Sequence, residues 1–187
     1  MKKIVVIILI VLSPISYLLA QQDYSHKFDL KIGNGLGFMG WGDVTVVSFE
    51  NELNYRINNY FTTAVSIGIG RGTQNDEFKR HNNYLQGSVN VFVSPFRNNK
   101  INNFRIGGGY SYINEVAAGI GGIRYYPVYE EDYYKDEYSV HCYNIIIEDE
   151  FKITTRLMIG AKFFLTGNFR EGYAEIWGGM IKFGVVL

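Results

Sequence analysis

The chain has 187 residues, of which 18 are lysine or arginine, 18 are aspartate or glutamate, and only one is cysteine. This charge balance gives no basic excess to attract nucleic acid, and a lone cysteine excludes an internal disulfide. The 15 tyrosines and 13 phenylalanines, set against three prolines, favour β-strands.

The first 20 residues have the layout of a secretory signal peptide. Lys2 and Lys3 precede an unbroken apolar run over residues 4–12, which is too short to cross a bilayer as a helix. We expect cleavage after Ala20, with an uncleaved anchor as the alternative. Because the removed segment carries two lysines and no acid, the mature domain, residues 21–187, keeps 16 basic and 18 acidic side chains.

The mature sequence alternates between apolar and polar residues, which is the period of a β-strand with two different faces. From residue 45 to residue 57, for example, Val47, Phe49 and Leu53 fall on one face, and Glu50 and Glu52 fall on the other. Eight segments of about 9 to 14 residues follow this pattern. They cover residues 28–38, 45–57, 61–70, 84–94, 104–112, 143–153, 156–166 and 177–187.

Alternation alone does not say which face points inward. A soluble sandwich or a lipocalin-like barrel buries the apolar face, whereas a membrane barrel exposes it to lipid. Here the polar face is rich in glycine, serine, asparagine and threonine, and its charges have both signs, which suits a narrow lumen filled by side chains. The charged residues are Lys31, Glu50, Glu52, Arg56, Glu148, Glu150, Lys162 and Lys182. The segments also exceed ordinary strand length, so we favour the membrane barrel.

Three segments carry a family resemblance. Residues 177–187 (WGGMIKFGVVL) resemble the C-terminal assembly signal of outer-membrane barrels, although that family usually ends on phenylalanine and this sequence ends on Leu187. Residues 104–110 (FRIGGGY) look like the glycine-rich central strand of small porin-like barrels, and residues 53–59 (LNYRINN) are similar to their periplasmic turns.

The resemblance implies an all-β, eight-stranded, antiparallel up-and-down transmembrane barrel in the outer membrane of a Gram-negative bacterium. It also implies contact with outer-membrane lipid and with the barrel-assembly machinery, the latter through the C-terminal strand. With both termini in the periplasm, short turns fall at residues 57–59, 95–101 and 152–155. Longer external loops fall at 39–42, 72–82, 114–137 and 167–173, and residues 114–137 are either a loop or an extended hairpin.

No residue is assigned a catalytic, cofactor-binding or metal-binding role. His81 is expected in an external loop. Ser139 and His141 share a strand face with Glu137, but same-face neighbours are about 7 Å apart, so a nucleophile–base pair is doubtful. Cys142 is expected to face the lumen as a packing residue.

The segment between residues 125 and 138 holds six tyrosines and the acidic run 130–132. We assign Tyr125, Tyr126 and Tyr138 to an aromatic girdle, and Tyr129, Tyr133 and Tyr134 to a surface that anchors a partner. The acidic run is expected to be a solvated loop tip rather than a cation site.

Three hypotheses of function follow. The leading one is a structural or surface-interaction barrel, with a lumen filled by side chains and with external loops that contact an extracellular ligand or surface. The second is a lipid-modifying enzyme of the lipid A deacylase or acyltransferase type, which would need Ser139 or His141. The third is a soluble secreted binding barrel of the lipocalin kind.

Overall fold

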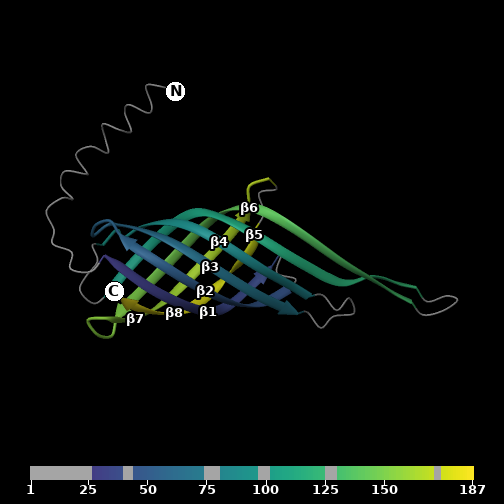
Figure 1. Ribbon diagram of the computed structural model, residues 1–187, viewed down its shortest axis with the longest axis horizontal. Coiled ribbons are helices and arrows are strands. Elements are labelled where there is room, and N and C mark those ends of the chain that lie inside the picture. Colours follow the sequence, from purple (N-terminus) through teal and green to yellow (C-terminus); the bar gives the residue numbers. More distant parts are fainter. Residues whose placement is uncertain (1–26, 40–43, 74–80, 97–101, 125–129, 171–173) are drawn as a thin grey trace, which may run out of the picture.

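The structure is a computed structural model that describes residues 27–39, 44–73, 81–96, 102–124, 130–170 and 174–187 (Figure 1). Eight antiparallel strands follow one another along the chain, and every sequence neighbour is also a neighbour in the sheet. The strands are β1 (Phe28–Met39), β2 (Val44–Arg56), β3 (Phe61–Thr73), β4 (His81–Val93), β5 (Asn102–Arg124), β6 (Glu130–Lys152), β7 (Leu157–Asn168) and β8 (Ala174–Val186).

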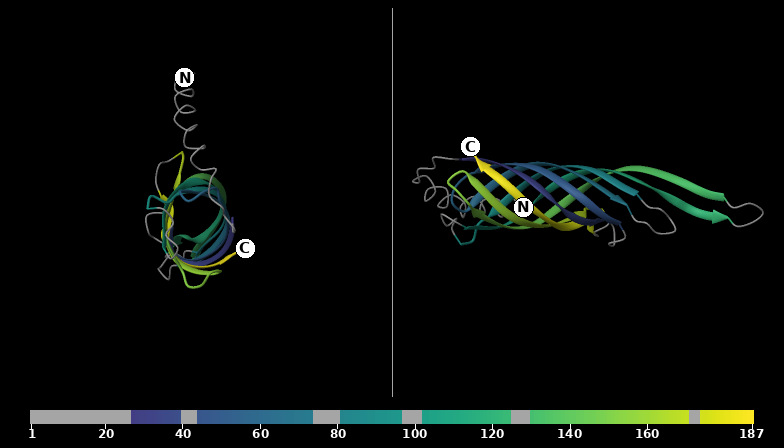
Figure 2. Two further views of the ribbon diagram at one scale, coloured as in Figure 1. Left: turned by 90° about the vertical axis from the view of Figure 1, so that its left-hand side faces the viewer. Right: turned by 90° about the horizontal axis from the view of Figure 1, so that it is seen from below.

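The sheet closes into a barrel because β8 pairs with β1, which leaves no open edge along the barrel wall. A view along the barrel shows the strands as a closed ring (Figure 2). The eight strands predicted from the alternating pattern are therefore confirmed. Within the described residues, no helix is long and apolar enough to cross a membrane.

The register of the sheet sets the tilt of the strands. Pairing partners followed once around the barrel from Phe104 lead back to β5 at Asn114, ten residues further along. With about 3.3 Å per residue and about 4.8 Å between strands, this stagger tilts the strands by about 40° from the barrel axis. A strand of 12 residues, such as β1, then rises roughly 30 Å, the thickness of a bilayer core.

The apolar face of every strand points outward. On β3, for example, Val65, Ile67 and Ile69 are 52–61% exposed, whereas Ala64 and Ser66, at the alternate positions, are buried. Such a largely apolar belt on the outside is what a lipid environment requires, and it contradicts the soluble lipocalin-like alternative.

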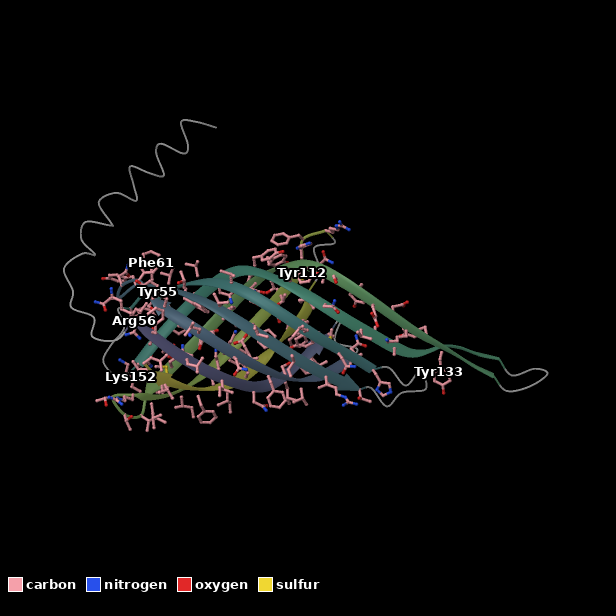
Figure 3. All side chains as sticks on the ribbon, viewed as in Figure 1. Tyr55, Arg56, Phe61, Tyr112, Tyr133 and Lys152 are labelled. Carbon is pink, nitrogen blue, oxygen red and sulfur yellow. The ribbon has the colours of Figure 1, made fainter. Side chains whose placement is uncertain are left out.

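Aromatic side chains form a girdle at each end of this belt. Phe28 packs on Tyr55 at one end, with ring centroids 5.0 Å apart, and Phe38 stacks on Trp177 at the other, at 4.5 Å. Figure 3 shows Tyr55 and Phe61 at the end that holds the C-terminus, and Tyr112 at the opposite end of the barrel wall. Girdles of this kind mark the two membrane interfaces.

Short turns join the strands at the end that holds the C-terminus, which we assign to the periplasmic side. The predicted turn at residues 57–59 is confirmed: the side-chain oxygen of Asn58 accepts hydrogen bonds from the backbone N–H groups of Tyr60 and Phe61, at 2.7 and 2.8 Å. Thr154 plays the same role in the turn before β7, where its hydroxyl accepts from the N–H of Leu157 at 3.0 Å.

The predicted external loop at residues 114–137 is mostly strand. β5 continues to Arg124 and β6 begins at Glu130, so the two 23-residue strands form the extended hairpin that the sequence left open. His81 is likewise not in a loop, because it begins β4 and pairs with Thr73. The predicted signal peptide, residues 1–20, lies outside the described residues.

Candidate functional site

The lumen and the projecting part of the β5–β6 hairpin are the two regions where polar side chains gather. The lumen is filled in three layers from the periplasmic to the extracellular end. The first layer is charged, the second is neutral and polar, and the third is apolar.

Arg105 on β5 is the centre of the charged layer. Its Nη2 atom lies 2.7 Å from Glu148 Oε2 and 2.9 Å from Glu52 Oε1, and its Nη1 atom donates to Asn54 Oδ1 at 2.8 Å. The guanidinium also lies 4.0 Å from the centre of the Phe92 ring. Side chains from β2, β4 and β6 therefore converge on one cation of β5 that is 1% exposed.

Three lysines complete the charged layer from the other side of the barrel. Lys182 Nζ lies 2.7 Å from Glu52 Oε2, and Lys162 Nζ lies 2.7 Å from Glu50 Oε1. Lys31 pairs with Glu150. All three lysines are buried, and each has a carboxylate partner. A buried charge requires such a partner, because the loss of its hydration must be offset.

The neutral layer is a hydrogen-bonded network above the charges. Ser111 Oγ donates to Asn144 Oδ1 at 2.8 Å, and Asn144 Nδ2 donates to Asn90 Oδ1 at 2.8 Å. Beside this network is a small cavity of about 20 Å³, which has room for one or two water molecules.

The apolar layer closes the extracellular end of the lumen. It is a cluster of buried side chains from β1, β2, β4, β5, β6 and β8, with Val140 and Phe164 packed against it. Its members are Met39, Val44, Val46, Tyr84, Ile113, Cys142 and Ile176. The predicted lumenal packing role of Cys142 agrees with this position.

The projecting hairpin consists of residues 119–124 of β5 and 130–141 of β6. β4 stops pairing with β5 at Ala118, and β7 stops pairing with β6 at Cys142. Beyond these points the two strands pair only with each other among the described residues, apart from one backbone hydrogen bond from Phe169 N–H to His141 O at 3.2 Å, and they reach roughly 20 Å past the start of β4. Figure 1 shows the hairpin extending far beyond the other strands, on the side opposite the C-terminus.

The described side chains at residues 133–139 of the hairpin are all exposed. Tyr133 is 70% exposed, and Figure 3 shows it far out on the hairpin. Lys135 Nζ donates to Glu137 Oε1 at 2.6 Å, and this hydrogen bond with the adjacent positive charge lowers the pKa of the Glu137 carboxyl.

The predicted Ser139 and His141 lie on the same outward face but do not contact each other. Ser139 Oγ accepts from Asn114 Nδ2 at 3.3 Å, whereas His141 Nδ1 pairs with the hydroxyl of Tyr110. The His141 ring also packs near Tyr112, with centroids 5.3 Å apart. The arrangement makes His141 a member of the extracellular aromatic girdle rather than the base of a nucleophile.

The tyrosines of residues 125–138 were expected either in a girdle or on a partner surface. Tyr138 does not belong to a lipid-facing girdle, because it lies on the same face of β6 as the lumenal Cys142; that part of the prediction is wrong. Tyr133 and Tyr134 are exposed on the hairpin, as the partner-surface hypothesis requires. Tyr125, Tyr126 and Tyr129 lie outside the described residues.

Sequence reasoning placed the lumenal charges correctly but missed their centre. The period-two pattern of residues 104–112 also puts Arg105 on the polar face, but it does not show that the acids gather around this residue. The available signal was a lone cation between Phe104 and Ile106 in the glycine-rich segment, because a buried cation needs a partner of opposite charge. Among the described residues, no group of histidine, cysteine or acidic side chains is arranged to hold a metal ion.

Comparisons with known proteins support the fold. OprG from Pseudomonas aeruginosa superposes with a TM-score of 0.62 at 8% identity, over 89% of this chain and 98% of that one. The N-terminal β-barrel domain of Pseudomonas aeruginosa OprF gives 0.54 at 10% identity, over 87% and 100%. The chain has the fold of a small outer-membrane β-barrel.

A further match is Ail, the attachment invasion locus protein of Yersinia pestis, in a complex with the heparin analogue sucrose octasulfate. It gives a TM-score of 0.52 at 12% identity, over 86% of this chain and 95% of that one. No protein-family model matches the chain, and no curated protein matches its sequence. The outer-membrane localisation predicted from the sequence agrees with the fold of these barrels.

Proposed function

We propose that this protein is a surface-interaction barrel, in which a closed lumen anchors the projecting hairpin and the hairpin contacts a partner outside the cell. The projection of the hairpin is the observation that carries this proposal. A pair of strands that extends well past the bilayer adds nothing to the barrel wall, and it presents exposed tyrosines where a partner can reach them.

The packing of the lumen supports the first half of the proposal. Buried ion pairs, a polar network and an apolar cluster fill successive layers of the barrel. A pore or a substrate pocket would need open space along the axis, and the cavity in the polar layer has room for only one or two waters. Ser139 and His141 have separate partners, so no observation favours the lipid-modifying enzyme.

The charge of the hairpin indicates the chemistry of the partner. Residues 119–139 contain five acids and two basic residues: Glu130, Glu131, Asp132, Asp136 and Glu137 against Arg124 and Lys135. An acidic surface attracts cations and repels polyanions. Although the similar barrel Ail was crystallised with a heparin analogue, this chain is suited to a cationic partner, such as a lysine-rich peptide segment.

The test is a binding measurement on the refolded barrel in nanodiscs of uncharged phosphatidylcholine. The probes are a fluorescent octalysine peptide and sucrose octasulfate. We expect saturable octalysine binding that weakens with salt, and no binding of the octasulfate.

The decisive variant replaces residues 119–134 with Asn-Gly. Because Ala118 pairs with Lys135, a two-residue turn can join the strands there. This variant should fold and lose octalysine binding, and the double substitution Asp136→Asn with Glu137→Gln should weaken it. Lys135→Glu, which increases the negative charge, should strengthen it. Equal binding by the shortened variant, or octasulfate binding in place of octalysine, would overturn the proposal.

A further inference from the structure

The middle of the lipid-facing belt contains two polar side chains, Asn34 on β1 and Asn51 on β2. Both point outward and both are exposed. The outward-facing residues two positions away on the same strands are all apolar: Ile32, Leu36, Phe49 and Leu53. Both amides therefore lie at the depth of the hydrocarbon core rather than at an interface.

Other polar side chains on the outer face lie near the ends of the belt. Asp149 pairs with Phe104 and Thr63 pairs with Tyr55, next to the periplasmic girdle. Arg71 lies near the extracellular end of β3. On the outer face of the described strands, Asn34 and Asn51 are thus the only amides or charges at mid-membrane depth.

These two asparagines are neighbours. Asn34 pairs with Phe49, and Asn51 pairs with Ile32, so the two side chains are diagonal neighbours on one face, about 7 to 8 Å apart. Neither side chain makes a hydrogen bond to a residue that the structure describes. A polar group in hydrocarbon is strongly unfavourable without a hydrogen-bond partner, so this position favours a partner that supplies hydrogen bonds inside the membrane.

An open groove of about 450 Å³ lies beside Asn34 on the outer face of β7, β8 and β1. Gly179 forms its floor, with Phe163 and Leu36 paired on either side. A methyl group at residue 179 would meet the Phe163 ring at 3.4 Å, which is ordinary contact, so packing does not require a glycine there. The glycine instead keeps the groove open.

We propose that Asn34, Asn51 and the groove at Gly179 form the contact surface of a symmetric dimer of this chain within the membrane. A two-fold axis brings one surface against an identical copy of itself. An asparagine amide both donates and accepts, so a matching amide from the second copy satisfies it. The ridge formed by Phe163 and Leu36 on one copy can enter the groove of the other. A lipid acyl chain could fill the groove, but it would leave both amides unsatisfied.

The experiment is sedimentation equilibrium of the refolded protein in density-matched detergent micelles. We expect a reversible monomer–dimer equilibrium for the natural sequence. The double variant Asn34→Leu/Asn51→Leu should weaken association about tenfold or more, because it removes the hydrogen bonds that the amides make across the interface within the membrane. Gly179→Leu, which fills the groove, should weaken it as well.

Gly87→Leu is the matched control. Gly87 also faces lipid, but it lies on β4, away from the groove, and a side chain there meets nothing within 4 Å. This variant should associate like the natural protein. Heat-modifiable migration on gels checks that each variant has folded. A natural protein that stays monomeric at all concentrations would overturn the proposal, as would a double asparagine variant that associates with unchanged strength.

Discussion

The lumen and the projecting hairpin both carry charges of both signs, but they use them differently. In the lumen, Arg105 is buried and held by acids from two other strands, and its charge cannot meet solvent. On the hairpin, Lys135 meets Glu137 two residues away, and both side chains are more than 60% exposed. The lumenal charges are therefore satisfied within the barrel, whereas the hairpin charges face solvent, where the proposed partner could reach them.

The largest expected effect comes from removing the centre of the lumenal charges. Arg105→Met leaves Glu148 buried without its nearest counter-charge and removes one of the cations that face Glu52, and breaking a buried ion pair from one side costs about 3 to 5 kcal/mol. We expect a loss of that size in the free energy of unfolding, measured by urea titration of the protein refolded into vesicles.

Lys135→Met is the matched control for that measurement. It removes an exposed cation of the hairpin, and exposed ion pairs contribute about 0 to 1 kcal/mol. If the two variants lost equal stability, the contrast between lumen and hairpin would be wrong.

A second, smaller effect tests how closely the barrel wall packs on its lumenal side. A methyl group at Gly109 would overlap the Val89 carbonyl oxygen and Asn90, so Gly109→Ala should cost about 1 to 3 kcal/mol. The preceding residue, Gly108, faces lipid, and a methyl group there would meet only the Asn144 carbonyl oxygen, at 3.4 Å. Gly108→Ala should therefore leave the urea midpoint nearly unchanged, and a reversed order of the two variants would contradict the assigned faces.

The smallest effect concerns His141, at the junction of barrel and hairpin. His141→Ala removes the hydrogen bond with Tyr110, and an exposed bond of this kind contributes less than about 1 kcal/mol. The variant should leave the profile of lipid A in the host membrane unchanged, as mass spectrometry would show. A changed profile would revive the lipid-modifying hypothesis.

Most of the barrel could be predicted from the sequence because strand faces alternate with a strict period of two. Once the polar face was recognised as a lumen, Lys31, Glu52 and Lys182 followed as inward-facing residues. Which charges meet could not be predicted, because Arg105 and Glu52 are far apart in the chain and only the stagger of the closed sheet brings them together.

The hairpin and the polar residues of the outer face were harder to predict from the sequence, for a different reason. Polar segments such as residues 130–137 read as loop by composition, and pairing with β5 overrides that preference. The girdle prediction for Tyr138 is wrong because this residue shares the inward-facing parity of Cys142 on β6. The sequence shows Asn51 as a polar residue on an apolar strand face. Its depth in the membrane and its closeness to Asn34 follow only from the register of β1 and β2.

Single-channel recording of the refolded natural protein in planar bilayers tests the central claim most directly. A lumen filled by the charged, polar and apolar layers should give no steady conductance steps, even with the hairpin shortened between Ala118 and Lys135. Stable, ohmic steps from the natural protein would contradict the closed lumen and would move the function from the hairpin to a pore.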